Sequence, residues 1–406
     1  TTTNMKRIIG ILIVALAVAG AGVNGWTAMA QEKQIAEIEQ EAQDTQECND
    51  ILKSCKELRR SGEFRKAVDE GIRYIAAGGA DSLAVVMDVL TTDVEYSEAM
   101  LRGRVSGDPM NIILWRTILS LFYNQTENYR MALKETLKMK WMLNGTGALA
   151  EYIGGYYYKL GMPEDAVTEL EGADDSVIQN DPAYYHCALG QCHQLAGHYA
   201  DAISEYSKAV DAGYAESSAF ISLGTCYEHL GEDSKAVDQY NLGIDQDDPA
   251  AYLCRGRIYL KQGHKDLAYA DFNAVVEKDT VLTEDSDRQF ALYSLGRYGE
   301  ALDWQKALDT RFPDSKEVDF RRACLYSLLN RTEDAVAAME AAFKHGLNNF
   351  SLIDNNEYLD AVSDIPEFKS LVEKHRSKHN AFVESIRKEI RSMLSGEGTG
   401  PAFCNS

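Results

Sequence analysis

The 406-residue chain is predicted to fold as an all-α, right-handed solenoid of about nine helix-turn-helix units, followed by C-terminal capping helices. Three features predict this architecture. An alanine recurs every 32 to 36 residues from Ala67 to Ala335. A Gly or Asn precedes most of these alanines by five residues, and a tyrosine precedes many of them by nine. A repeat of this length is one helical hairpin that cannot bury its apolar face alone, so successive hairpins must stack.

Each position of the repeat has a structural role. The alanine allows the second helix of a unit to approach the first closely, and it is Ala67, Ala99, Ala132, Ala166, Ala202, Ala236, Ala268, Ala301 and Ala335. The residue five positions earlier ends the first helix in the left-handed conformation, and it is Gly62, Gly161, Gly197, Gly231, Gly263, Gly296 or Asn330. The ring nine positions before the alanine is Tyr123, Tyr157, Tyr227, Tyr259 or Tyr326, with His193 and Leu292 as variants.

The N-terminus has the features of a bacterial export signal. Met5 is a plausible start, Lys6 and Arg7 precede an apolar run over residues 8–18, and small residues before Gln31 suggest cleavage after Ala30. The alternative is an uncleaved N-terminal anchor, and the body of the chain is exported on either interpretation. The predicted setting is therefore the periplasm or cell envelope of a bacterium, or secretion, with no membrane span after cleavage.

The remaining boundaries are predicted from the pattern. We expect a charged leading helix or linker over residues 31–47, the array over residues 48–347, capping helices over residues 348–395 and a disordered tail over residues 396–406. The net charge of −22 argues against nucleic acid as a partner. Eight cysteines are too sparse for a disulfide framework in so long a chain, so most are expected to be small buried residues.

The stretch YYHCALGQCH, residues 184–193, raises the question of a metal site. His186 and His193 share one helix face, but Cys187 and Cys192 lie about 140° apart around the helix, so the four side chains cannot converge on one ion. They are predicted to be structural, and no metal or cofactor is expected. The chain contains no P-loop, HExxH, GxSxG or CxxC motif, so it is not expected to be an enzyme.

The central units resemble the tetratricopeptide repeat family. LGQCHQLAGHYADAISEYSKAV (189–210), LGTCYEHLGEDSKAVDQYNLGI (223–244) and RGRIYLKQGHKDLAYADFNAVV (255–276) share the family's pattern of small, aromatic and glycine positions. The resemblance covers residues 48–347 and includes the rings Tyr206, Tyr240 and Phe272 and prolines in the joints. Residues 349–376 are similar to the closure that follows some bacterial arrays of this family.

The resemblance implies that the first helices line a concave groove that binds a protein or peptide. The residues eleven, eight and seven positions before each alanine are then expected to face the groove: Tyr158, Lys159, Gln191, Gln194, Thr225, Glu228, His229, Arg257 and Lys261. Arg257 and Lys261 lie four residues apart and would suit a carboxylate. The Lys/Asn clamp of the members that bind chaperone tails is absent. The predicted function is an exported interaction scaffold, and the alternatives are a periplasmic assembly factor with many clients or a regulatory subunit of a separate envelope enzyme or glycan system.

Overall fold

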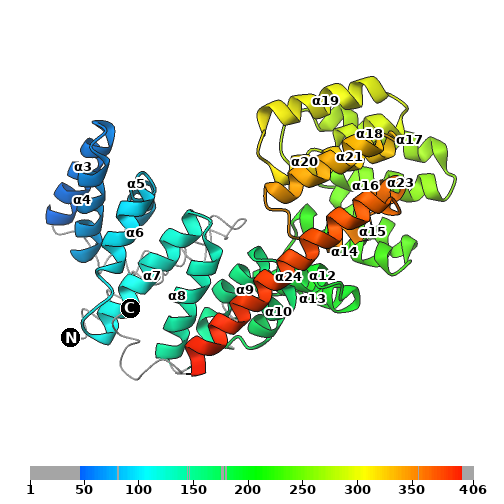
Figure 1. The fold of residues 1–406 in the computed structure, drawn as a ribbon. Helices are drawn as coiled ribbons and strands as arrows, with labels where there is room; N and C mark the ends of the chain where they lie inside the picture. The colour runs from blue at the N-terminus through cyan, green and yellow to red at the C-terminus, as the bar shows by residue number, and fades with distance from the viewer. Residues whose placement is uncertain are drawn as a thin grey trace. The chain divides into compact units, whose positions relative to one another are not determined.

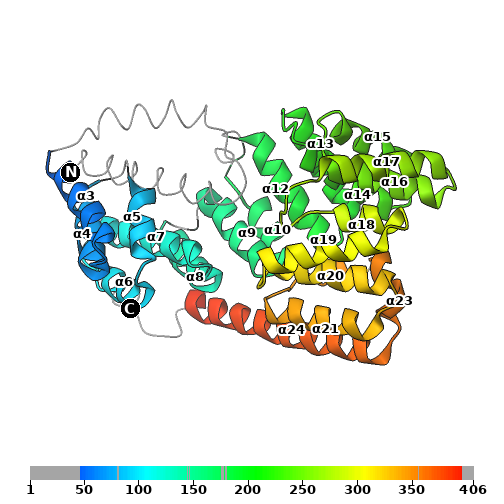
Figure 2. The same ribbon diagram turned by 90° about the horizontal axis from the view of Figure 1, so that it is seen from above.

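The computed structural model describes residues 46–79, 82–143, 145, 147–174, 178, 181–354 and 356–395. Within these residues the structure consists of helices joined by short turns and contains no strand (Figures 1 and 2). The chain divides into two compact units, Thr1–Leu160 with Ile386–Ser406, and Gly161–Ser385. The predicted signal segment, nearly all of the leading segment and the predicted tail lie outside the described residues. No helix in the described part of the chain is long and apolar enough to cross a membrane.

The first unit contains three successive helix pairs. They are α3 (Gln46–Arg60) with α4 (Phe64–Ala76), α5 (Leu83–Leu90) with α6 (Val94–Arg102), and α7 (Pro109–Gln125) with α8 (Tyr129–Met142), followed by η1 (Gly147–Leu149) and α9 (Ala150–Lys159). The second helix of each pair contacts the next first helix, as α8 contacts α9. The last turns of α24 (Pro366–Ser395) also belong to this unit, and there Glu389 accepts hydrogen bonds from Arg130 and Lys134 of α8.

The second unit begins with α10 (Pro163–Glu171) and contains five further pairs. They are α12 (Pro182–Leu195) with α13 (Tyr199–Asp211), α14 (Ser217–His229) with α15 (Asp233–Ile244), α16 (Pro249–Lys261) with α17 (Lys265–Lys278), α18 (Arg288–Ser294) with α19 (Tyr298–Arg311), and α20 (Lys316–Leu328) with α21 (Thr332–Lys344). The pairs stack in chain order, because α13 contacts α14, α15 contacts α16 and α17 contacts α18. The predicted all-α solenoid of helix pairs is confirmed.

Aspartates cap several of the first helices, and left-handed residues end the first helix of most pairs. Asp108, Asp181 and Asp248 each accept a hydrogen bond from a backbone N–H of the helix that follows, and each stands directly before a proline at the first helical position. All seven predicted turn residues, from Gly62 to Asn330, have φ between 55° and 83°. The left-handed conformation that ends these helices is therefore as predicted.

Eight of the nine repeated alanines are completely buried, and one is not. Ala67, Ala132, Ala166, Ala202, Ala236, Ala268, Ala301 and Ala335 are each 0% exposed. The prediction is wrong for Ala99, which is exposed on α6, while Ser97 is the buried small residue of that helix. The hydroxyl of Ser97 donates to the carbonyl of Leu90 over 2.7 Å, so a serine replaces the alanine there without an unsatisfied polar group.

A second small residue completes the contact inside the central pairs. The rings of Tyr206, Tyr240 and Phe272 are fully buried and lie over glycines of the preceding helix. A Cβ added at Gly224 would stand 2.5 Å from Cε1 of Tyr240, and the equivalent distances are 2.9 Å at Gly190 and 2.8 Å at Gly256. The Leu-Gly and Arg-Gly dipeptides in the sequence are therefore explained by the close approach of an aromatic ring.

The segment after α21 covers the end of the second unit. It consists of α22 (Ser351–Asp354), η2 (Glu357–Leu359), α23 (Asp360–Ser363) and the first turns of α24. His375 of α24 stacks on Phe343 of α21 with ring centroids 4.4 Å apart, and the two helices lie side by side in Figure 2. Leu359, Val362 and Phe368 join the same hydrophobic core as α17 to α21. The segment thus buries apolar surface that the last pair would otherwise expose.

Candidate functional site

The structure places the nine predicted groove residues on the last turns of first helices. Tyr158 is half-buried and Lys159 is exposed on α9 of the first unit. The other seven residues belong to α12, α14 and α16 of the second unit and are described together below.

On α12, two glutamines present amide groups. Gln191 is exposed. Gln194 is half-buried, and its Oε1 accepts a hydrogen bond of 2.7 Å from the hydroxyl of Tyr206 on α13. Because the oxygen of Gln194 is engaged, its amide NH2 is the group left to donate to another molecule.

On α14, Glu228 holds the position equivalent to Gln194. Its Oε2 accepts a hydrogen bond of 3.0 Å from Tyr240 on α15, which repeats the Gln194–Tyr206 contact. In the next unit the ring is Phe272, which has no hydroxyl, and the equivalent residue is the apolar Leu260. The two positions therefore change together, and the polar residue is present where a buried hydroxyl needs an acceptor.

The neighbours of Glu228 on α14 are also held in place. Thr225 donates its hydroxyl to the carbonyl of Ile221 over 2.9 Å. The imidazole of His229 stacks on the ring of Tyr199, with centroids 4.3 Å apart and an interplanar angle of 6°. Desolvation by burial lowers the pKa of His229, with Glu228 opposing and Arg257 reinforcing the shift.

On α16, the two cations are already paired within the chain. Arg257 donates to Glu228 over 3.2 Å and to Glu357 of η2 over 2.5 Å. Lys261 lies 3.3 Å from a carboxylate oxygen of Asp233. The sequence had suggested that Arg257 and Lys261 would receive a partner's carboxylate, and the structure shows that carboxylates of the same chain contact both of them.

The contact between Arg257 and η2 was not found from the sequence. The guanidinium of Arg257 lies 5.2 Å from the ring centroid of Tyr358, and this ring also stacks on Phe290 of α18 at 4.7 Å. The pKa of Tyr358 is raised, first by burial. Arg257 and Phe290 each stand eleven residues before the alanine of their unit, Ala268 or Ala301. A short segment of the chain, η2, therefore lies against the first helices α16 and α18 of two successive helix pairs.

The histidine and cysteine cluster of α12 does not form one site. Nδ1 of His186 lies 2.6 Å from a carboxylate oxygen of Glu205 on α13, so this histidine is in an ion pair or hydrogen bond. Cys187 and Cys192 are buried, and burial raises the pKa of these thiols to about 11 and about 12. His193 is only 7% exposed, and its Nδ1 is buried without a hydrogen-bond partner.

The cysteines of the described residues are not bridged to one another and are mostly buried. Cys48, Cys55, Cys187, Cys192, Cys226 and Cys324 are buried thiols, and Cys254 is partly buried. The prediction that most cysteines are small buried residues is confirmed for this part of the chain. Cys404 lies outside it.

The first-helix surface of α12, α14 and α16 therefore carries amide, carboxylate and imidazole groups that are fixed by contacts to second helices, and a hydroxyl that is fixed by a bond within α14. Fixed donors and acceptors suit the binding of a polypeptide segment, because little side-chain entropy is lost when it binds.

Part of the sequence matches a known protein family. Residues 187–251 match the family model described as tetratricopeptide repeat. DnaJ homolog subfamily C member 3 is 31% identical over 131 residues in both Bos taurus and Homo sapiens, which is 30% of this chain and 25% of each relative. The chain thus matches about a quarter of the length of these relatives.

Solved structures with a similar fold have low sequence identity. A tetratricopeptide repeat protein from Parabacteroides merdae is 14% identical with a TM-score of 0.43, and the likeness covers 60% of this chain and 95% of that one. YrrB, described as a TPR protein with an unusual peptide-binding site, is 19% identical with a TM-score of 0.31, covering 46% of this chain and 97% of that one. The family match shows tetratricopeptide repeats over residues 187–251, and helix pairs repeat through both compact units. This fold supports a role as a scaffold for protein–protein interaction.

Proposed function

We propose that this protein is an exported scaffold that binds a protein or peptide segment on the first helices of the second unit, and that it performs no catalysis itself. One observation carries the proposal. Residues Glu357 and Tyr358 lie on this surface in the manner of a bound peptide, held by the Arg257 guanidinium and by stacking on Phe290.

Among the described residues, η2 contacts this surface at Arg257 and Phe290, and the surface continues from there towards α12. Arg257 and Phe290 hold the position eleven residues before the repeated alanine, and Thr225 and Gln191 hold this position in the two preceding units. A partner segment would therefore follow the line that η2 begins, and it would meet Thr225, Gln191 and the amide of Gln194. These groups are neutral donors and acceptors, which suit the backbone amides of an extended or helical segment.

The cellular setting is part of the proposal and is supported by the sequence. Lys6 and Arg7 followed by an apolar run and a small-residue cleavage site favour export. The partner would then be another protein of the periplasm or cell envelope of a bacterium, or a secreted protein.

The test is affinity capture of crosslinked partners from an envelope extract of the source organism. The variant is Gln191→Glu/Thr225→Glu, which places two carboxylates on the proposed contact surface. The matched control is Tyr269→Glu/Asn273→Glu, which places two carboxylates on exposed positions of the second helix α17. We expect the first variant to lose the partner and the control to retain it, because desolvating an unpaired charge opposes binding.

The number of captured proteins separates the proposal from its alternatives. One partner in equal amount to the bait supports a dedicated scaffold. Many partners at low occupancy support an assembly factor with many clients, and capture of an envelope enzyme supports a regulatory subunit. Equal capture by wild type and Gln191→Glu/Thr225→Glu would show that the first-helix surface is not the contact.

A further inference from the structure

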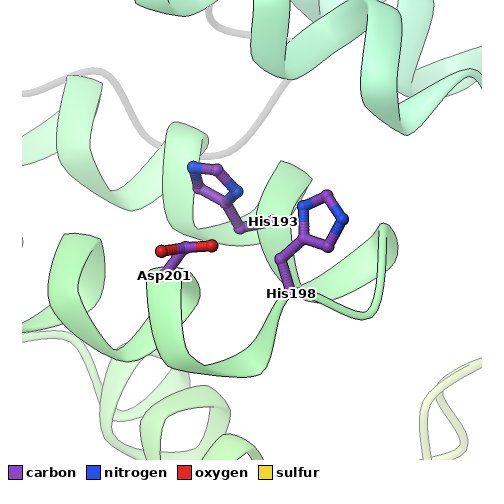
Figure 3. Close-up of side chains that lie close together, drawn as sticks. All are labelled: His193, His198 and Asp201. Carbon is purple, nitrogen blue, oxygen red and sulfur yellow. The ribbon is translucent and has the colours of Figure 1, made fainter.

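Three side chains with metal-binding groups meet at the turn between α12 and α13. They are His193 on α12, His198 at the start of α13 and Asp201 in its first turn, and Figure 3 shows them at the same end of the hairpin. One potential ligand atom from each lies within 4.8 Å of the other two. This set shares only His193 with the sequence cluster that was rejected above as a metal site.

The buried member of the set has an unsatisfied nitrogen. His193 is 7% exposed, and its Nδ1 has no hydrogen-bond partner although it is shielded from solvent. An unpartnered buried nitrogen costs stability unless another group or an ion satisfies it. A metal ion bound by the imidazole would supply an interaction in place of the missing hydrogen bond.

The backbone holds the three positions together without the ion. The N–H of His198 donates to the carbonyl of His193 over 2.8 Å, and the N–H of Ala202 donates to the carbonyl of His198 over 2.9 Å. Gly197 between the two histidines has φ of +78°, which makes the tight turn possible. His198 and Asp201 are exposed, so their side chains can rotate towards an ion while His193 stays fixed.

The other hairpins show what normally occupies these positions. The residues nine, four and one before the repeated alanine are His193, His198 and Asp201 in this unit alone of the nine. In the Ala236, Ala301 and Ala335 units the last two positions form ion pairs, which are Glu232–Lys235, Arg297–Glu300 and Arg331–Asp334. The position of His193 is a tyrosine in the Ala236, Ala268 and Ala335 units. A pair that only closes the turn therefore does not require a histidine at residue 193.

We propose that His193, His198 and Asp201 bind one divalent transition-metal ion of the zinc class. Two imidazoles and one carboxylate favour such ions over Mg2+ and Ca2+. Water or a fourth group would complete a tetrahedral site. Ligand atoms around a tetrahedral zinc ion lie roughly 3.3 to 3.6 Å apart, from metal–ligand bonds of about 2.0 to 2.2 Å. The ligand atoms in the structure lie within 4.8 Å of one another, and rotation of the two exposed side chains can bring them to this tetrahedral spacing. The acidic chain also attracts cations.

The experiment is isothermal titration calorimetry, in which zinc chloride is titrated into the full chain. The wild-type chain is compared with variants at each proposed ligand. We expect one zinc ion per chain for wild type and at least tenfold weaker binding for His198→Ala and for Asp201→Asn. Both of these residues are exposed, so neither substitution removes core packing. His193→Tyr tests the buried ligand with the residue that the neighbouring units carry at this position.

His264→Ala is the matched control. His264 stands at the His198 position of the Ala268 unit, where Tyr259 and Leu267 replace the other two ligands, so this variant should bind zinc as wild type does. Cobalt(II) serves as a spectroscopic probe and should give bands of nitrogen and oxygen coordination without thiolate charge transfer. Zinc binding that is absent in wild type, equal in wild type and His198→Ala, or accompanied by a cobalt–thiolate band would overturn the proposal.

Discussion

Replacing Gly224 by alanine tests the packing inside a helix pair. The added Cβ would lie 2.5 Å from Cε1, 2.8 Å from Cδ1 and 3.0 Å from Cζ of Tyr240. Nonbonded carbon atoms prefer separations of about 3.5 to 4.0 Å, so the ring would have to move by about 1 Å. Tyr240 cannot move freely, because its ring is 0% exposed and its hydroxyl donates to Glu228 over 3.0 Å.

The expected free-energy change has two opposing parts. Overpacking of a tight core costs typically about 1 to 3 kcal/mol, and a clash with a ring fixed at both ends belongs in the upper half of that range. Replacing glycine by alanine inside a helix gains about 1 kcal/mol. We therefore expect Gly224→Ala to lower the free energy of unfolding by about 1 to 2 kcal/mol.

Urea denaturation followed by far-ultraviolet circular dichroism measures this change. Gly155→Ala is the control, because a Cβ at this position of α9 meets nothing within 4 Å, and it should raise the free energy of unfolding by about 0.5 to 1 kcal/mol. In a Tyr240→Leu background the cost of Gly224→Ala should largely disappear, since the two sites are in contact. If Gly224→Ala is as stabilising as Gly155→Ala, the explanation of the repeated glycine is incorrect.

Three further predictions concern other features of the fold. Arg116 and Glu135 form an ion pair with side chains that are each 2% exposed. Glu135→Leu alone should lower the free energy of unfolding, measured by chemical denaturation, by about 3 to 5 kcal/mol, and Arg116→Met/Glu135→Leu should recover most of that loss. Equal stability of the single and double variants would contradict this prediction. Glu127 takes the left-handed turn position with φ of 56°, so Glu127→Gly should raise the melting temperature through a gain of about 0.5 to 1 kcal/mol, and a lower melting temperature would refute the strain. Because the pKa of His229 is lowered in the folded chain, the unfolded chain binds the proton more readily. The stability that this residue contributes is therefore present above the unfolded pKa of about 6.5 and is lost as the pH falls towards the folded pKa. His229→Gln should make the urea midpoint less sensitive to pH over that window, and a pH profile identical to that of wild type would refute this prediction.

The repeat could be predicted from the sequence because its determinants are local. Each hairpin needs a left-handed residue at the turn and a small residue at the helix contact, and both needs recur at a fixed spacing. The failure at Ala99 has the same origin. A pattern based on alanine alone does not recognise that Ser97 can replace alanine when its hydroxyl bonds to the carbonyl of Leu90. The pattern therefore predicts the nearest alanine, Ala99, although this residue faces solvent.

The candidate surface could be predicted only in part. The spacing placed Gln194 and Glu228 on equivalent turns, but their role as acceptors for Tyr206 and Tyr240 depends on contacts between helices. The exchange of Tyr for Phe272 together with Leu260 was a usable signal in the sequence. The docking of Tyr358 on Phe290 was not, because a single aromatic residue in an acidic segment carries no spacing that points to its partner.

The central functional claim is that a polypeptide partner contacts the first helices of the second unit. A photocrosslinking amino acid at position 191 on α12 and another at position 269 on α17 test it most directly, since both positions are exposed and lie on first and second helices respectively. We expect a crosslinked partner from position 191 and none from position 269. Crosslinking from position 269 alone would contradict it.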